Sequence, residues 1–348
     1  LLSSFILIWV GKKIDDINIS RFALFVILLL SFSSFLFSKI SSVVFLFIAI
    51  LLMRFSGQGM MSHTATTTIS RYFTKSRGKA LSAGWFGLSS AEFILPVLIV
   101  YLLTIYQWQS IWISISIIVI IFLPIASFFL VREINFNSRE TKEDENFFNG
   151  KIKDWKRIEV IKDYRFYIIC ANMLAMPWIA TGTFVYQSFI LESKNWGPFI
   201  LAQSFMVYSI MTIATLFVAG FLIDKFTSRK LLIFINIPLL FSVFVIIFFD
   251  NPISAFFFLG LIGITNGFAN VLGSSTWAEI YGVKYIGSIK ALTTALMVFA
   301  TAFGTALFGV LIDKGFSIEQ IAVISSVYIS ISLISLLLIK DKLNPTKI

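Results

Sequence analysis

The chain has 348 residues, of which 58% are hydrophobic and only 13% are charged. Soluble domains carry about 25% charged residues, so this composition excludes an ordinary soluble protein and indicates a membrane protein. The single cysteine, Cys170, cannot form a disulfide within the chain, and redox chemistry is therefore not an expected function.

Ten apolar stretches are long enough to cross a lipid bilayer as helices, which takes about 20 residues each. We expect spans at residues 22–38, 42–70, 79–104, 108–131, 166–190, 199–222, 230–249, 252–276, 286–312 and 317–339. The apolar segment 1–10 in front of them is too short to cross, and we interpret it as the end of a helix whose beginning is missing. The sequence therefore predicts an all-α membrane protein.

A short motif occurs twice, each time in a charged turn between two apolar stretches. Its first copy holds Gly11, Asp15 and Arg21, and its second copy holds Gly220, Asp224, Arg229 and Lys230. Each glycine permits two helices or a loop to approach closely. Each aspartate can lie at a helix N-terminus or pair with an arginine. A repeated loop of this kind indicates a repeated membrane domain.

The positions of the two copies predict two related bundles. Four spans follow each copy, but two spans precede the second copy and only the short segment precedes the first. The tripeptide Lys-Ala-Leu also occurs twice, at residues 79–81 and 290–292, and these two copies are 211 positions apart. The expected fold is two pseudo-symmetric six-helix bundles, with the first helix and much of the second missing. The expected parts are an N-terminal bundle, a cytoplasmic linker with an amphipathic helix, a C-terminal bundle and a cytoplasmic tail, at residues 1–131, 132–165, 166–340 and 341–348.

The distribution of the formal charge of +10 is explained by membrane topology and does not indicate a nucleic acid partner. Loops on the side of the two motifs hold 24 lysines and arginines, whereas loops on the other side hold three. Basic loops stay on the cytoplasmic side of a membrane, so loops 11–21, 71–79, 132–165 and 224–230 and the C-terminus are expected there. We expect a monomeric integral protein of the bacterial inner (plasma) membrane, with the lipid bilayer and a small-molecule solute as its partners.

The one long polar stretch connects the two bundles. Residues 135–150 are charged and rich in turn formers, which is typical of a flexible linker. Residues 151–165 mix Trp155, Ile158 and Ile161 with lysines at helical spacing, which indicates a helix lying on the inner leaflet. We interpret this stretch as a tether, with regulation by a partner as the alternative.

The paired motifs resemble the loop motif of the major facilitator superfamily, which lies after the second and the eighth of twelve helices. The segments around Arg71, Arg77 and Asp163 are similar to those of its monocarboxylate and oxalate–formate branches. The first motif departs from the family pattern, because Asp16 and Ile19 stand where a basic residue is usual. The resemblance implies a secondary transporter that works by alternating access, with no cofactor and no metal. It also implies that the motif residues, together with Arg71 and Arg77, form a cytoplasmic gate between the two halves.

Charged side chains inside a bilayer cost several kcal/mol, so those that occur there are functional candidates. Arg54 and Glu92 lie near the centres of two consecutive antiparallel spans, where pairing makes such charges tolerable. One interpretation is a structural ion pair. In the other, Arg54 binds an anionic substrate and Glu92 takes a coupling proton. His63 is half a helical turn out of phase with Arg54, and we interpret it as a packing or interfacial residue.

Neutral polar side chains extend the candidate site, because they can orient a substrate through hydrogen bonds. Hydrogen bonding between helices is an equal competitor for each of them. Besides Arg54 and Glu92, the candidates for substrate binding or proton coupling are Gln58, Trp178, Tyr186, Gln187, Asn266 and Asn270.

We therefore expect the solute to be a small organic anion such as a monocarboxylate, carried with or against protons. Efflux of amphipathic compounds or drugs is the alternative within transport, although residues 84–87 read Gly-Trp-Phe-Gly in place of the Gly-Pro pattern of drug–proton antiporters. A non-transporting receptor would need a soluble domain, and the longest loop here has about 35 residues. An enzyme is not expected, because no span holds paired aspartates, a Ser–Lys dyad or a His-Glu-x-x-His metal motif.

Overall fold

The computed structural model describes residues 2–73, 76–133 and 153–344, and the regular structure in these ranges is helical. The first part of the chain forms α1 (Leu2–Val10), η1 (Gly11–Asp15), α2 (Ile19–Ser38), α3 (Val43–Met53), η2 (Arg54–Met61), α4 (Ser62–Tyr72), α5 (Arg77–Leu103) and α6 (Trp108–Glu133). The second part forms α8 (Arg157–Lys162), α9 (Tyr164–Val185), α10 (Gln187–Lys194), α11 (Pro198–Phe226), α12 (Ser228–Leu231), η3 (Leu232–Phe234), α13 (Ile237–Phe248), α14 (Ser254–Tyr281), α15 (Ile286–Asp313), α16 (Ile318–Leu338) and η4 (Lys340–Lys342). The linker expected at residues 135–150 lies outside the described ranges, and the expected amphipathic segment contains α8.

The membrane spans agree with those predicted. Within the described ranges, nine helices are long and apolar enough to cross a membrane, and each corresponds to one of the predicted spans. One of them is the continuous helix Val43–Tyr72, which joins α3, η2 and α4. The remaining prediction, at residues 79–104, corresponds to α5, which has 27 residues. The predicted all-α membrane architecture is confirmed.

Local side-chain chemistry decides where several of these helices begin and end. Asn18 precedes α2 and accepts a hydrogen bond from the Ser20 amide at 2.9 Å. Ser42 precedes α3 and accepts a hydrogen bond from the Phe45 amide at 3.2 Å. Such caps satisfy amides that have no partner within the first turn. α14 ends at Tyr281 and is followed by Gly282, whose φ of +83° is a conformation that glycine adopts without strain.

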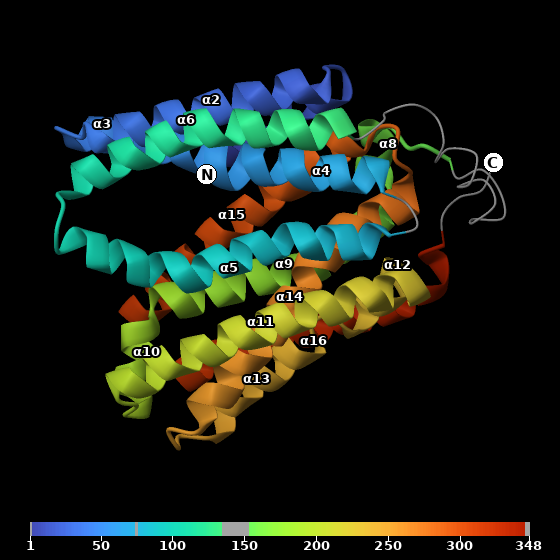
Figure 1. Cartoon of the computed structure of the whole chain (residues 1–348). Helices are drawn as coiled ribbons and strands as arrows, with labels where there is room; N and C mark the ends of the chain where they lie inside the picture. Colours follow the sequence, from blue (N-terminus) through green and yellow to red (C-terminus); the bar gives the residue numbers. More distant parts are fainter. Residues whose placement is uncertain (1, 74–75, 134–152, 345–348) are drawn as a thin grey trace.

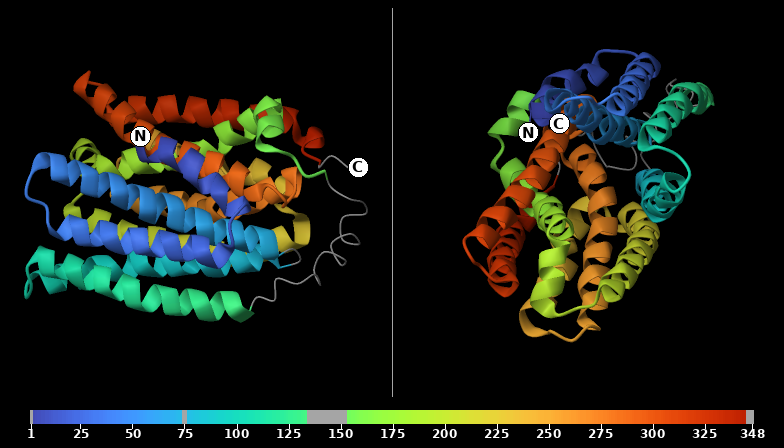
Figure 2. Two further views of the ribbon diagram at one scale, coloured as in Figure 1. Left: turned by 90° about the horizontal axis from the view of Figure 1, so that it is seen from above. Right: turned by 90° about the vertical axis from the view of Figure 1, so that its left-hand side faces the viewer.

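The helices form two groups that meet along α5 and α15 (Figure 1). We refer to residues 2–133 as the N-terminal half and to residues 164–344 as the C-terminal half. α2 packs on α6 in the N-terminal half, and α13 packs on α16 in the C-terminal half. α5 packs on α11 of the opposite half, while α15 packs on α1 and η1 of the opposite half. The long helices run roughly parallel (Figure 2), so α5 and α15 carry the interface along the length of the bundle.

An ion-pair cluster lies at one end of the C-terminal half, at the end opposite the linker. The Lys194 ammonium lies 2.6 Å from a carboxylate oxygen of Asp250 and 2.7 Å from one of Glu319. Burial by itself lowers the pKa of Lys194, but hydrogen bonds to the two carboxylates outweigh it, and the pKa is raised. The cluster links α10, the loop after α13 and α16 to one another, all within one half.

A close crossing of α9 and α15 should make the fold sensitive to one glycine. A methyl group at Gly304 would overlap the backbone carbonyl of Trp178. Overpacking of this kind costs about 1–3 kcal/mol, so we expect Gly304→Ala to lower the midpoint of thermal unfolding of the purified protein. Gly87→Ala is the matched control, because a methyl group at this exposed helical position meets no atom within 4 Å. Equal midpoints for the two variants would contradict the observed crossing.

Candidate functional site

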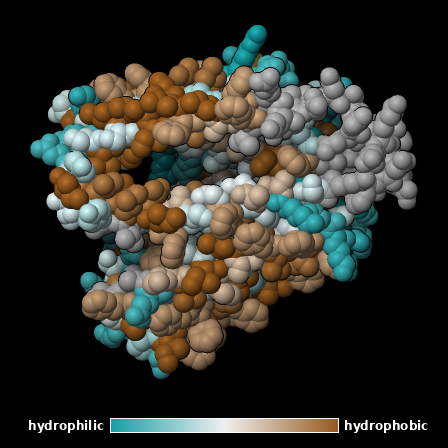
Figure 3. All heavy atoms as spheres, viewed as in Figure 1, coloured by the Kyte–Doolittle hydropathy of each residue, from teal (hydrophilic) through white to brown (hydrophobic). Residues whose placement is uncertain are grey.

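A cavity of about 310 Å³ lies between the two halves. Its N-terminal wall comes from η2, α4 and α5, and its C-terminal wall comes mainly from α9, α14 and α15. The polar side chains that line it include Gln58, Ser62, Thr66, Asn266, Asn270, Ser274, Lys290, Thr293, Thr294 and Thr301. In Figure 3 the visible face is hollowed between the helices at the top and α5, with hydrophilic residues at the bottom of the hollow.

Lys290 is the one charged residue among the described residues that line the cavity. It lies one turn into α15, and only 3% of its surface is exposed. Its ammonium donates to the hydroxyl of Ser70, in the opposite half, at 3.4 Å. Within the described ranges it forms no ion pair, and the charge that acts on it is the cation of Arg77, which repels an ammonium. A buried ammonium without a counter-charge is costly, and an anion in the cavity would offset that cost.

Three of the predicted substrate residues, Gln58, Asn266 and Asn270, line this cavity. Asn266 donates to the hydroxyl of Tyr208 at 2.8 Å. Gln58 accepts a hydrogen bond from the guanidinium of Arg54 at 2.7 Å. Arg54 itself is exposed and does not line the cavity. Arg54 is therefore connected to the cavity lining only by its hydrogen bond to Gln58 among the described contacts.

Arg54 and Gln58 lie on a π-helical turn, η2, inside an otherwise α-helical span. Such turns are rare and occur frequently at functional sites. Glu92 belongs to α5, but its side chain lies outside the described residues. The proposed pairing of Arg54 with Glu92 therefore stays a prediction.

The structure places the three other predicted substrate residues away from the cavity lining. Trp178 is buried against Phe308 and Tyr328 within the C-terminal half. Tyr186 stacks on Phe308, and Gln187 begins the short helix α10. Tyr186 and Gln187 lie away from the lining because α9, the helix that lines the cavity, ends at Val185.

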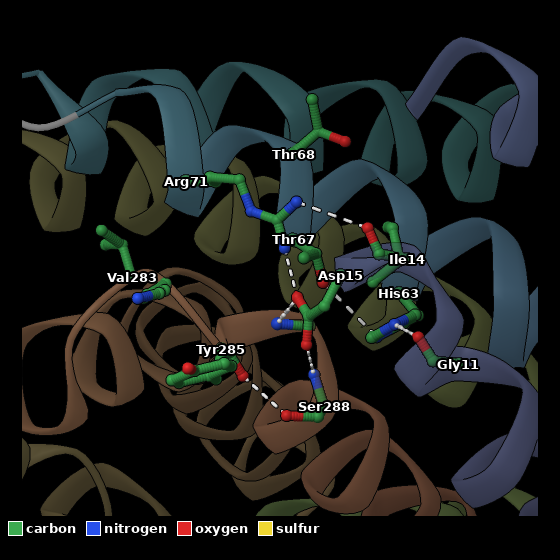
Figure 4. A network of polar contacts seen from close by, with 12 residues as sticks. Gly11, Ile14, Asp15, His63, Thr67, Thr68, Arg71, Val283, Tyr285 and Ser288 are labelled. Atoms are coloured by element: carbon green, nitrogen blue, oxygen red, sulfur yellow. Dashed lines mark hydrogen bonds and ion pairs between the residues drawn. The ribbon is translucent and has the colours of Figure 1, made fainter. Parts of the chain in front are cut away.

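The first motif connects the N-terminal half to α15 (Figure 4). The carboxylate of Asp15 accepts hydrogen bonds from the amides of Gly287 at 2.9 Å and of Ser288 at 2.6 Å. These amides belong to the first turn of α15, where they have no partner within the helix. The guanidinium of Arg71 pairs with the same carboxylate. Burial raises the pKa of the Asp15 carboxyl, although Arg71 and the two amides act in the opposite direction.

The second motif makes the reciprocal contact with α5. Asp224 accepts hydrogen bonds from the amides of Gly78 at 2.8 Å and of Lys79 at 3.2 Å, in the first turn of α5. A methyl group at Gly78 would overlap the carbonyl of Gly220, so α5 and α11 cross in close contact there. Each motif thus caps a helix of the opposite half.

The two contacts repeat at one interval along the chain. Asp15 and Asp224 are separated by 209 positions, and so are their partners Gly78 and Gly287. The repeated tripeptide at residues 79–81 and 290–292 had suggested an offset of 211. The hydrogen bonds set the offset of the repeat at 209 residues, because equivalent residues are identified there by equivalent contacts and not by sequence similarity.

The remaining residues of the predicted gate lie around these contacts. Arg77 is buried and donates to the Phe73 carbonyl at 3.0 Å, and Arg229 donates to Asn344 at 2.9 Å. Arg21 and Lys230 are exposed. Gly11 is buried, and its carbonyl lies 2.9 Å from Nε2 of His63. His63 is fully buried, in agreement with its interpretation as a packing residue, and its described hydrogen-bond partners lie in its own half.

Hydrogen bonds between the two halves gather at the linker end of the molecule. Besides the two aspartate contacts, Ser82 donates to the Leu216 carbonyl at 2.6 Å and Ser70 donates to the Ser274 carbonyl at 3.3 Å. The linker adds one more contact, from Arg157 to the Ile8 carbonyl at 3.0 Å. At the opposite end, the described ion pairs of Lys194 stay within one half. The halves are therefore joined at the linker end.

The sequence profile of the Major Facilitator Superfamily matches residues 1–305. Among solved structures, the chain is similar to the MFS transporter FucP in the outward conformation, with a TM-score of 0.71 and 10% identity over 96% of this chain and 86% of that one. It is also similar to a structure of the E. coli fucose:proton symporter FucP, with a TM-score of 0.68 and 11% identity over 96% of this chain and 87% of that one. Identities this low show a shared fold only. No curated protein matches the sequence.

Proposed function

Because the chain belongs to the major facilitator superfamily, whose members move small solutes across a lipid bilayer, we propose that its solute is a small organic anion. Membership makes the chain a secondary transporter and an integral membrane protein. The observation that carries the anionic assignment is the buried amine of Lys290 in the cavity, whose ammonium form an anion would stabilise there. Among the described residues that line the cavity there is no aspartate or glutamate, so the site is complementary to an anion.

The linker end is proposed to face the cytoplasm, because the loops there carry most of the lysines and arginines. The hydrogen bonds that join the halves at that end support a state closed toward the cytoplasm. Alternating access then requires the two aspartate contacts to break so that the halves rock apart around the central cavity. In this proposal Asp15 and Asp224 form the cytoplasmic gate.

Two charged residues are proposed to assist the anion site. The exposed guanidinium of Arg54, held by Gln58 at the cavity wall, would attract the anion toward the cavity. Glu92, in the middle of α5, is the proposed site of a coupling proton. The proposal that transport is coupled to protons rests on this one residue.

The function can be tested with the purified full chain in proteoliposomes that contain unlabelled pyruvate. We expect radiolabelled pyruvate to be taken up, and we expect external unlabelled pyruvate or lactate to suppress this uptake. Pyruvamide should not suppress it, because the amide lacks the negative charge that Lys290 requires. Competition by fucose or by amphipathic cations, with none by carboxylates, would contradict the proposal.

The matched variant for proton coupling is Glu92→Gln, because the neutral amide resembles the protonated carboxyl. Exchange of pyruvate in the unmodified protein should respond to an imposed pH gradient, and in this variant it should continue without that response. A variant that responds to the gradient as the unmodified protein does would exclude Glu92 as the proton site.

A further inference from the structure

One glycine of α14 leaves open space inside the cavity. Gly273 lies within this helix and lines the cavity. A methyl group at Gly273 would meet no atom of another described helix within 4 Å. At Gly263 and Gly267 of the same helix, a methyl group would overlap backbone carbonyls of α11. Those two glycines let α14 and α11 cross closely, whereas Gly273 faces room that no described side chain fills.

The fold gives no other reason for a glycine at this position. A glycine inside a helix destabilises it relative to alanine, because glycine loses more backbone freedom on folding. The close crossing of α14 and α11 accounts for this cost at Gly267. At Gly273 no described contact between helices requires it, so the space left in the cavity is what the residue contributes.

This open space lies beside the amine of Lys290. The hydroxyl of Ser70 connects the two, because it donates to the Ser274 carbonyl at 3.3 Å and accepts from the Lys290 amine at 3.4 Å. Ser274 directly follows Gly273 in α14. An anionic group held by Lys290 therefore lies next to this part of α14, and the rest of the solute can extend into the room at Gly273.

A polar side chain lines the cavity one turn away on the same helix. Asn270 lies three residues before Gly273, so the two share a face of α14 and are about 4.5 Å apart along its axis. Asn270 is half-buried, and its amide is accessible and has no hydrogen-bond partner among the described residues. An amide can donate and accept, so it matches a hydroxyl or a keto oxygen on the solute.

We propose that Gly273 and Asn270 form the subsite for the body of the anion, and that Gly273 sets the size of body that the cavity accepts. This inference rests on the proposed anion transport and narrows its substrate class to hydroxy or keto monocarboxylates. One carboxylate is expected, because Lys290 is the one charged residue among the described residues of the lining. Asn270 binds the hydroxyl or keto oxygen, and Gly273 leaves room for the carbon body beside it.

The test of size uses two hydroxy acids that differ only in their body, glycolate and α-hydroxyisovalerate. Calorimetric titration of the purified full chain should show that α-hydroxyisovalerate binds at least as tightly as glycolate. Gly273→Val should raise the Kd of α-hydroxyisovalerate by about tenfold or more and leave that of glycolate unchanged, because the valine fills the space of the branched body.

Gly87→Val is the matched control for this substitution. A methyl group at Gly87 also meets no atom within 4 Å, but this glycine is exposed on α5 and does not line the cavity. Its two Kd values should equal those of the unmodified protein. Gly273→Val and Gly87→Val should unfold at the same temperature, because neither valine meets a described neighbour.

A second comparison tests the amide with lactate and propionate, which differ by one hydroxyl. A hydrogen bond between neutral groups strengthens binding by about three- to tenfold, and we expect the unmodified protein to prefer lactate by that factor. Asn270→Leu keeps the size of the side chain and removes its polar atoms, so this preference should be lost while the Kd of propionate stays the same. Gly87→Val should keep the preference.

Several results would overturn the inference while anion transport stands. They are an unchanged Kd of α-hydroxyisovalerate in Gly273→Val, an equal loss of both hydroxy acids in that variant, and unfolding of that variant below Gly87→Val. A preference for lactate that persists in Asn270→Leu would do the same. Failure of the unmodified protein to bind or transport any carboxylate would overturn the proposed function itself, and the inference with it.

Discussion

Replacement of Lys290 by glutamine is expected to lower pyruvate uptake by about a hundredfold or more. The estimate follows from the loss of one partner of a buried charge pair, which costs about 3–5 kcal/mol, where each 1.4 kcal/mol is about tenfold. Lys290 is the one charged group among the described residues of the cavity lining, so no neighbour there can take over its role. Uptake by proteoliposomes measures the effect, and Lys290→Arg, which keeps the charge in a different geometry, should retain part of the activity.

The control for this prediction is Lys284→Gln, six residues earlier in the chain. Lys284 is exposed in front of α15 and should be replaceable without loss of uptake. Lys290→Gln should also unfold at a temperature no lower than the unmodified protein, because it removes a buried charge that has no described counter-charge. A variant that transports normally, or one that fails only because it does not fold, would contradict the assignment of Lys290 to the solute.

The second large effect is expected at the two aspartates of the gate. Asp224→Asn and Asp15→Asn each replace a carboxylate that accepts hydrogen bonds from two amides of a helix in the opposite half. Hydrogen bonds to charged groups contribute about 1.5–3 kcal/mol each, and loss of even one shifts the closed-to-open ratio by about tenfold or more. We therefore expect both variants to open at the linker end.

Opening can be measured as the reactivity of a cysteine at Ser274, which lines the cavity beside the closed end. In a protein with Cys170→Ala and Ser274→Cys, each aspartate variant should raise the rate of labelling by a membrane-impermeant maleimide, added on the linker side, by about tenfold. Asp16→Asn is the matched control, because Asp16 is exposed next to Asp15 and should leave the rate unchanged. Equal labelling of all the proteins would show that the aspartates do not hold the halves together.

The pH dependence of the gate should follow the same contacts. Burial raises the pKa of Asp15, so acidification on the linker side protonates this carboxyl at a higher pH than an exposed aspartate. Protonation removes the charge that holds the amides of α15. The labelling rate in the unmodified gate should therefore rise as the pH falls when it is expressed relative to the rate in Asp15→Asn, which records the loss of thiolate at low pH. In Asp15→Asn the rate should already be high and lose this part of its pH dependence.

Several features of the site were open to prediction, because they depend on short stretches of sequence. The two motifs could be recognised as equivalent, and the structure gives Asp15 and Asp224 reciprocal partners. Gln58, Asn266 and Asn270 were predicted near the solute, and they line the cavity. The 24 lysines and arginines assigned to loops on the motif side include Lys290, although it stands inside the predicted span 286–312. Its position within a span is the one signal in the sequence that could have identified it as a site residue.

The sequence by itself determined the spans, their order and the doubling of the bundle, because the free energy of placing a residue in lipid depends mainly on its own apolar surface. Only the tertiary structure decided that Lys290 and Gly273 face one cavity while Trp178 does not. It also decided that Arg54 is exposed beside Gln58, on a π-helical turn that shifts the register of its span. The physical reason is that the direction of a side chain follows from the rotation and close packing of helices far apart in the chain, such as α5 on α11 and α15 on α1. A hydropathy pattern records how deep a residue lies in the membrane, and the packing of its helix decides what it faces.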